Sequence, residues 1–128
     1  MQVLVDSSIW VDYFRSGANS ATLDILIDEN LLVTNDIILA ELVPFLQVKK
    51  QTEIIRLLRA IQKLPLQIDW VEIIQFQTAC LQAGVNGVGI PDLLIAQNAR
   101  QNQCVIYSLD KHFQLIQPII DIELLETE

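Results

Sequence analysis

The chain has 128 residues, of which 52% are hydrophobic, and it carries a net charge of −8. This length and apolar share predict a single folded domain over 1–128 and exclude a disordered chain, and no apolar stretch approaches the roughly 18–20 residues of a membrane span. The net negative charge excludes binding of nucleic acid through overall charge. Either a contact with nucleic acid is local, or bound cations offset the acids, or the partner is a basic molecule, or no nucleic acid is bound.

The first expected element is a short buried strand, Val3 to Val5, that ends at Asp6. Ser7 or Ser8 is then expected to cap a helix that runs to about Ser16. Because almost nothing precedes this strand, we expect it to be central in the sheet. An acid at the carboxyl end of a strand lies in the crevice where open α/β sheets place ligands, so Asp6 is the first candidate site residue.

A second helix begins at Ser20, and a short strand follows at 31–34. Asn35 or Asp36 then caps a third helix, in which nearly every residue up to Leu46 is apolar.

Glu41 is the only charge between Asp36 and Lys49, in the middle of that apolar helix. A carboxylate on an apolar helix face is costly without a partner, so we favour a site residue over one that only points to solvent. Pro44 is expected to bend the helix beside Glu41.

Five of the eight basic residues lie between Lys49 and Lys63. Arg56, Arg59 and Lys63 are spaced three and four apart, which predicts one shared helix face. A solvated amphipathic helix explains this pattern, and a contact with RNA or a protein partner is the alternative.

A short extended piece is expected at 64–68, and Asp69 caps the helix that runs to about Ala83. The glycine-rich stretch 84–89 lacks any phosphate-loop pattern and reads as a turn. Pro91 suits the first turn of the next helix, and taken alone Asp92 is best explained as its cap.

The last part of the chain begins with a second buried strand over 104–109, directly followed by Asp110. Residues 111–113 are expected to begin a turn or short helix. An edge strand is expected at 118–122, and 123–128 is expected to be a frayed acidic tail.

Cys80 and Cys104 lie in apolar surroundings and lack the short spacing of a metal site. They are predicted to be reduced core thiols of a cytoplasmic protein rather than a disulfide. The N-terminus also lacks the basic region of a signal peptide, so we expect the protein in the cytoplasm.

Strands and helices alternate along the chain, which predicts an α/β fold of three layers, α/β/α, around a central mostly parallel sheet of four to five strands. Because parallel strands end on the same side, Asp6 and Asp110 face the same crevice. Asp92 begins the helix before the second of these strands, and Glu41 projects from the helix after the strand at 31–34. One shared site explains all four acids together.

Carboxylates that share a site repel one another strongly. Two unit charges about 4 Å apart interact by about 4 kcal/mol at an effective dielectric of about 20, so the group holds protons or a cation. An all-oxygen site favours Mg²⁺ or Mn²⁺, while one histidine and two scattered cysteines argue against zinc.

The acids occur in four motifs, which are Val5-Asp6-Ser7-Ser8-Ile9-Trp10, Ala40-Glu41-Leu42, Ile90-Pro91-Asp92 followed by Ile95-Ala96, and Ser108-Leu109-Asp110. In this order they resemble the PIN-domain ribonucleases, and most closely the VapC-type toxins of type II toxin–antitoxin pairs. The likeness extends from Met1 to about Ile120. It implies a PIN-like fold with an active site of Asp6, Glu41, Asp92 and Asp110, in which Ser7 follows the first acid and Ser108 precedes the fourth.

The resemblance further implies a metal-dependent endoribonuclease that hydrolyses RNA phosphodiester bonds with Mg²⁺ or Mn²⁺. Asp6, Asp92 and Asp110 are the expected metal ligands, directly or through water. Glu41 either completes the ligand set or acts as the general base. The implied partners are RNA, a cognate antitoxin whose tail occludes the site, and a second copy in a homodimer. Candidates for contacts with RNA phosphates are Lys111, His112, Arg56, Arg59 and Lys63.

Three other interpretations compete with this one. A haloacid-dehalogenase-type phosphotransferase needs a second Asp two residues after Asp6, where Ser8 stands. A response-regulator receiver needs paired acids at the end of the first strand, which are missing. The serious alternative is a non-catalytic PIN-like domain kept as a binding or regulatory partner, which the sequence leaves open.

Overall fold

Five parallel strands form one central sheet in the computed structural model, which describes residues 1–126. The order across the sheet is β3-β2-β1-β4-β5, so the first strand is central as predicted. Val3 of β1 pairs with Leu32 on one side and with Val105 on the other. The strands are β1 (Val3–Val5), β2 (Leu32–Thr34), β3 (Gln62–Lys63), β4 (Val105–Tyr107) and β5 (Glu123–Leu124).

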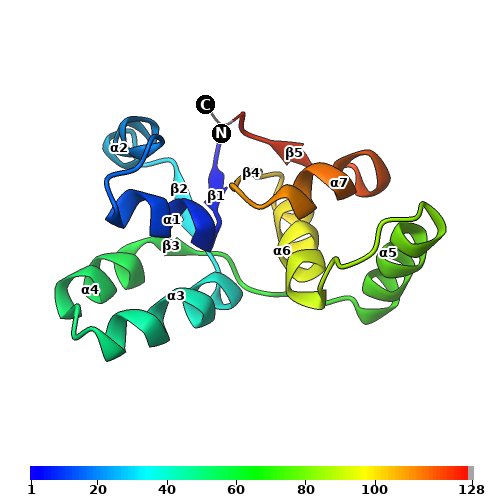
Figure 1. The fold of residues 1–128 in the computed structure, drawn as a ribbon, viewed down its shortest axis with the longest axis horizontal. Helices are drawn as coiled ribbons and strands as arrows, with labels where there is room; N and C mark the ends of the chain where they lie inside the picture. The colour runs from blue at the N-terminus through cyan, green and yellow to red at the C-terminus, as the bar shows by residue number, and fades with distance from the viewer. Residues whose placement is uncertain (127–128) are drawn as a thin grey trace.

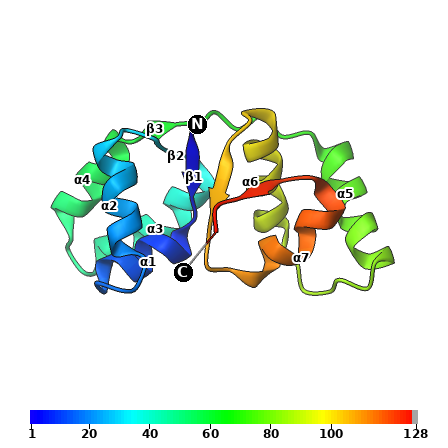
Figure 2. The same ribbon diagram turned by 90° about the horizontal axis from the view of Figure 1, so that it is seen from above.

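Helices cover both faces of this sheet, with α1–α4 on one side and α5–α7 on the other (Figures 1 and 2). The predicted α/β/α arrangement is therefore confirmed, and the described strands are all parallel. Helix α3 packs against α1 and α4 and also against α6. The helices are α1 (Ser7–Phe14), α2 (Ser20–Asp28), α3 (Asp36–Val48), α4 (Thr52–Ala60), α5 (Trp70–Gln82), α6 (Ile90–Gln101) and α7 (Lys111–Ile120).

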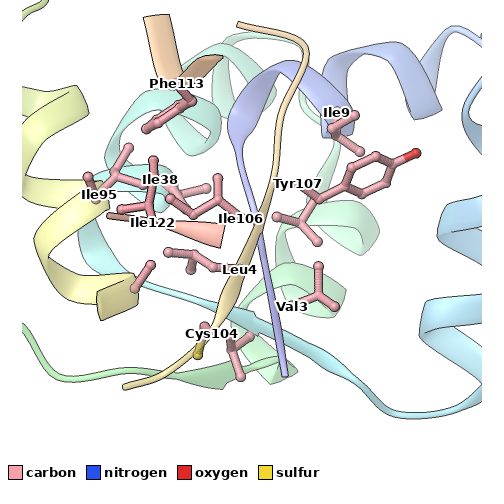
Figure 3. Packing of buried hydrophobic residues seen from close by; sticks show 14 of the residues in the cluster. Val3, Leu4, Ile9, Ile38, Ile95, Cys104, Ile106, Tyr107, Phe113 and Ile122 are labelled. Carbon is pink, nitrogen blue, oxygen red and sulfur yellow. The ribbon is translucent and has the colours of Figure 1, made fainter. Parts of the chain in front are cut away.

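The core sits on both faces of the two central strands, β1 and β4. Leu4 and Ile106 are fully buried and lie on the side of Ile95 and Phe113, as Figure 3 shows. Tyr107, the next residue of β4, lies toward the opposite side, as strand alternation requires. Burial of this apolar surface holds the ends of the two strands in fixed positions.

Caps fix several helix starts. The Oδ1 atom of Asn35 accepts a hydrogen bond from the backbone N–H of Ile38 at 3.0 Å, and Asp69 caps α5 in the same way through Glu72 at 3.1 Å. The first helix differs from the prediction, because the residue at its N-cap position is Asp6, not Ser7 or Ser8. The turn into α1 therefore places the acid itself at the junction of strand and helix.

The C-terminal region was predicted wrongly. Helix α7 continues through Pro118 to Ile120, where an edge strand was expected, and it buries Phe113, Ile116 and Ile120 at helical spacing. The edge strand is β5, inside the stretch expected to be a frayed tail. The end of that predicted tail, residues 127–128, lies outside the described residues.

The basic stretch was also predicted partly wrongly, because α4 ends at Ala60 and Lys63 belongs to β3. Lys63 therefore does not share a helix face with Arg56 and Arg59, and its Nζ atom lies 3.1 Å from Asp36 Oδ1. The extended piece at 64–68 forms no strand of its own.

Two further expectations concern the cysteines and membranes. Cys80 and Cys104 are both buried and unpaired, as predicted. Within residues 1–126, no helix has the length and apolar character to cross a membrane.

Candidate active site

Asp6 lies at the carboxyl end of β1 and is only 5% exposed. Its Oδ2 atom accepts hydrogen bonds from the hydroxyls of Ser8 at 2.9 Å and Ser108 at 2.7 Å. Ser8 Oγ in turn accepts from the N–H of Leu109, and Ser108 Oγ accepts from the N–H of Asp110, both at 2.9 Å. The two hydroxyls thus tie the end of β1 to the end of β4 and hold the Asp6 carboxylate in place.

One of these serines was missed by sequence reasoning. Ser108 was expected near the fourth acid, as observed. After the first acid, Ser7 was the expected serine, but the hydroxyl that donates to Asp6 belongs to Ser8. The sequence offers two adjacent hydroxyls, and only the path of the chain between strand and helix decides which one turns back to the carboxylate.

Asp110 follows β4 and caps α7, since its Oδ1 atom accepts from the backbone N–H of His112 at 2.9 Å. The imidazole of His112 also turns toward the acids. Its Nδ1 atom lies 3.2 Å from Asp110 Oδ1 and 3.1 Å from Asp92 Oδ2. From the sequence, His112 was predicted only as a candidate contact with an RNA phosphate, and its position between two carboxylates was not predicted.

Asp92 is the third residue of α6, whose N-cap residue is Gly89. The explanation of Asp92 as a helix cap is therefore wrong, although Pro91 occupies the first turn as expected. Burial, and then the charge of Asp110, raises the pKa of Asp92 above its ordinary value, partly offset by His112. Asp92 is thus a partly buried acid held against another acid.

Glu41 extends from the middle of α3, which runs unbroken through Pro44 to Val48. Loss of hydration is the largest cause that raises the pKa of Glu41, followed by the negative charges of Asp6, Asp92 and Asp110. The residue as a whole is exposed, so its carboxylate remains reachable from solvent. The structure therefore places the four candidate acids close enough for their charges to interact.

The chemistry of these donors fits a divalent cation. One ligand atom each from Asp92, Asp110 and His112 lies within 4.8 Å of the others, while Asp6 and Glu41 lie outside this tight group. No lysine or arginine among residues 1–126 forms an ion pair with any of the four acids. Carboxylates with a single imidazole suit Mn²⁺, and Mg²⁺ through the oxygens and retained water.

Ser8→Ala is expected to weaken Mn²⁺ binding about ten- to hundredfold, the usual cost of removing a group that orients a metal-binding carboxylate. Titration calorimetry measures the affinity directly. Ser7→Ala is the matched control, because the hydroxyl of Ser7 does not bond Asp6. Equal Mn²⁺ affinities for the two variants would contradict a role of Ser8 in orienting Asp6.

The fold and the site together define a class, an α/β/α domain with a parallel sheet and an acidic site beyond its strand ends. The chain belongs to the PIN domain family, whose model matches residues 3–117. PIN domains are generally nucleases, and the acidic cluster is present in this chain.

Solved structures with the same fold come from several bacteria. One is the structure of VapBC2 from Rickettsia felis, bound to a DNA fragment from the VapBC2 promoter. It contains a chain that is 19% identical to this one with a TM-score of 0.78, and the match covers 100% of both chains. VapBC-1 from nontypeable Haemophilus influenzae matches at 20% identity, with 98% of each chain covered and a TM-score of 0.77. FitAcB from Neisseria gonorrhoeae matches at 23% identity, covering 98% of this chain and 97% of the other, with a TM-score of 0.74. No curated protein matches the chain by sequence.

Proposed function

We propose that the chain is a divalent-metal-dependent endoribonuclease and the toxin of a toxin–antitoxin pair. The observation that carries the proposal is the meeting of four carboxylates from separate segments, of which Asp92 and Asp110 lie against the same imidazole. Membership of the PIN domain family supports nuclease chemistry. Carboxylates alone suit only a hard cation, so the choice of RNA as substrate rests on the resemblance to VapC-type toxins.

In this proposal Asp92 and Asp110 hold the cation, with His112 as a further donor and Asp6 acting directly or through water. A bound divalent cation supplies positive charge that activates water and neutralises the phosphate and the leaving oxygen. Glu41 either completes the ligand set or accepts the proton of the attacking water at a carboxylate oxygen. Its exposure supports the second role, because solvent water can reach the carboxylate. The water oxygen bonds to phosphorus as the bond to the leaving oxygen breaks, and the leaving oxygen takes up a proton from solvent.

Asp6→Asn is expected to abolish RNA cleavage that the wild type performs with Mg²⁺ or Mn²⁺. The change keeps the size of the side chain but removes its charge at a site where two hydroxyls already donate to it. Cleavage of a labelled RNA is measured on gels, with and without EDTA. Asp28→Asn is the matched control, since Asp28 is an exposed acid of α2.

RNA cleavage that survives both EDTA and Asp6→Asn would overturn the enzyme proposal. The alternative of a non-catalytic binding or regulatory partner requires a different outcome, in which the wild type cleaves no RNA with either cation. Mapping cleavage ends across cellular RNA after induction then identifies the target.

An antitoxin partner is proposed because similar solved structures are VapBC complexes. Induced expression is expected to arrest growth, and co-expression of a small protein encoded beside this chain is expected to relieve the arrest. Unrelieved growth arrest with every neighbouring small protein would argue against a toxin–antitoxin pair. The reduced cysteines and an RNA target both suit the cytoplasm.

A homodimer is also proposed. Trp70, Val71 and Ile74 near the start of α5 are 56%, 68% and 65% exposed, and exposed apolar side chains of this size are typical of protein interfaces. Light scattering after size exclusion measures the mass in solution, and a monomer at micromolar concentration would contradict this part of the proposal.

A further inference from the structure

A groove of about 450 Å³ opens beside the acidic site, between α1 and α3. Figure 1 shows these two helices on the same side of the sheet, with α4 next to them. Glu41 belongs to the acidic cluster and also lines this groove. The groove therefore shares Glu41 with the proposed reaction centre, and its volume lies within the usual range of about 300–1,000 Å³ for ligand pockets.

Three residues that line the groove follow one another at four-residue spacing, two within α3 and one at its C-cap, which places them on one helix face. Glu41 comes first, Phe45 next and Lys49 last, with steps of about 6 Å along the helix axis. The Phe45 ring is 60% exposed, and Lys49 Nζ lies 5.9 Å from its centroid. This face presents an acid, an aromatic ring and a cation in that order.

The far side of the groove adds a second cation, Arg15, and an aromatic wall, Phe14. In the described part of the chain, neither Arg15 nor Lys49 forms an ion pair with a carboxylate. Buried Leu42 and Leu46 supply apolar lining. The groove thus combines an exposed ring with two cations that lack a carboxylate partner, in a chain whose net charge is −8.

We propose that this groove binds one unpaired nucleotide of a single-stranded substrate, next to the phosphate held at the acids. The base stacks on Phe45, and Lys49 and Arg15 bind the backbone phosphate. Only an unpaired base presents its face to an aromatic ring, and rings combined with cations are the usual means of binding single strands. The inference rests on the proposed function for the reaction, and it provides the local contact that an acidic protein needs to bind nucleic acid.

Phe45→Ala is expected to weaken the binding of a short fluorescent single-stranded RNA about 5- to 150-fold, the usual effect of removing one stacked base. Binding is measured by fluorescence anisotropy with Asp92→Asn as the background, so that cleavage does not interfere. Phe45→Trp restores the affinity because tryptophan also stacks. Val48→Ala is the matched control, since Val48 is 79% exposed on the same helix but does not line the groove.

Lys49→Gln is expected to lower the slope of log affinity against log salt concentration by about 0.7, the value for one phosphate contact on a single strand. Lys50→Gln, the adjacent residue outside the groove, leaves that slope unchanged. A single-stranded DNA of the same sequence shows the same dependence on Phe45, because stacking does not read the sugar. Duplex RNA does not depend on Phe45.

In the active protein with a cation, Phe45→Ala raises KM for RNA with little change in kcat. Equal RNA affinities for Phe45→Ala and Val48→Ala would overturn the proposal. A change of oligomeric mass in Phe45→Ala with unchanged RNA affinity would overturn it too, and would assign this face to a protein interface.

The two proposals fail separately. Phe45-dependent RNA binding by a wild type that cleaves nothing would support the groove and overturn the nuclease. Cleavage that requires Asp6, together with RNA binding that does not require Phe45, would overturn the groove and support the nuclease.

Discussion

Asp92→Asn is expected to reduce RNA cleavage by more than about a hundredfold and, in EDTA, to raise the melting temperature. Removing a group that only orients a ligand costs about 10- to 100-fold, so loss of a proposed ligand costs more. The gain in stability has a separate cause, because Asp92 is partly buried against the charge of Asp110. Asparagine fills the same space without that charge.

The sign of the pH dependence follows from the raised pKa of Asp92. A carboxyl whose folded-state pKa exceeds its unfolded value of about 3.9 contributes stability that is complete below that value and is lost as pH rises through the folded one. At a pH above that folded-state pKa, the ionised Asp92 therefore destabilises the metal-free fold. The difference in melting temperature between Asp92→Asn and the wild type should shrink as the pH falls toward 3.9.

With a cation bound, the wild type is expected to melt at a higher temperature than Asp92→Asn, the reverse of the order in EDTA. At a hundred times its Kd, a cation adds about 2.7 kcal/mol to the stability of the wild type, or about 10 °C in melting temperature for a chain of this size. Asp92→Asn gains little, while the control Asp28→Asn gains as much as the wild type. A metal-free Asp92→Asn protein that melts below the wild type, or equal cation effects on both, would contradict the argument.

The sequence indicated the acidic site because its signals are local. Short buried runs that end in Asp6 and Asp110 mark strand ends, and parallel pairing of β1 with β4 brings those ends together. Glu41 was recognisable as an isolated charge in an apolar helix. Asp92 carried no such signal, since a carboxylate in the first turn of a helix is ordinary.

Other parts of the site depend on contacts between distant residues. Ser8 and Ser108 meet at Asp6 across 100 positions of sequence, and no spacing rule relates them. His112 bonds Asp92 only because α6 and α7 pack side by side. Local patterns predict which residues end a strand, whereas tertiary packing decides which side chains face each other.

The errors near the C-terminus have a similar origin. Pro118 and its apolar neighbours favoured a strand, but the spacing of Phe113, Ile116 and Ile120 is helical, and burial of that face outweighs the single proline. Residues 123–124 pair with β4 although this strand is short and begins with an acid, because an edge strand needs only one partner.

Phe113→Ala is expected to lower the free energy of unfolding by about 3–5 kcal/mol, the usual cost of truncating a buried phenylalanine. The side chain is only 1% exposed, and α7 packs against both α5 and α6. Because small domains are stable by only about 5–15 kcal/mol, this loss is a large share of the total. Urea unfolding followed by circular dichroism measures it.

The same substitution connects the core to the site. Phe113 directly follows His112, and Asp110 caps the same helix, so a loosened start of α7 displaces two of the proposed metal donors. Cation binding should therefore weaken even at temperatures where Phe113→Ala remains folded. Leu115→Ala, at a position 48% exposed on the same helix, should change stability by no more than about 0.5 kcal/mol and leave cation affinity intact. A loss below about 1 kcal/mol for Phe113→Ala, or unchanged cation affinity, would mean that Asp110 and His112 are held in place without the core beneath them.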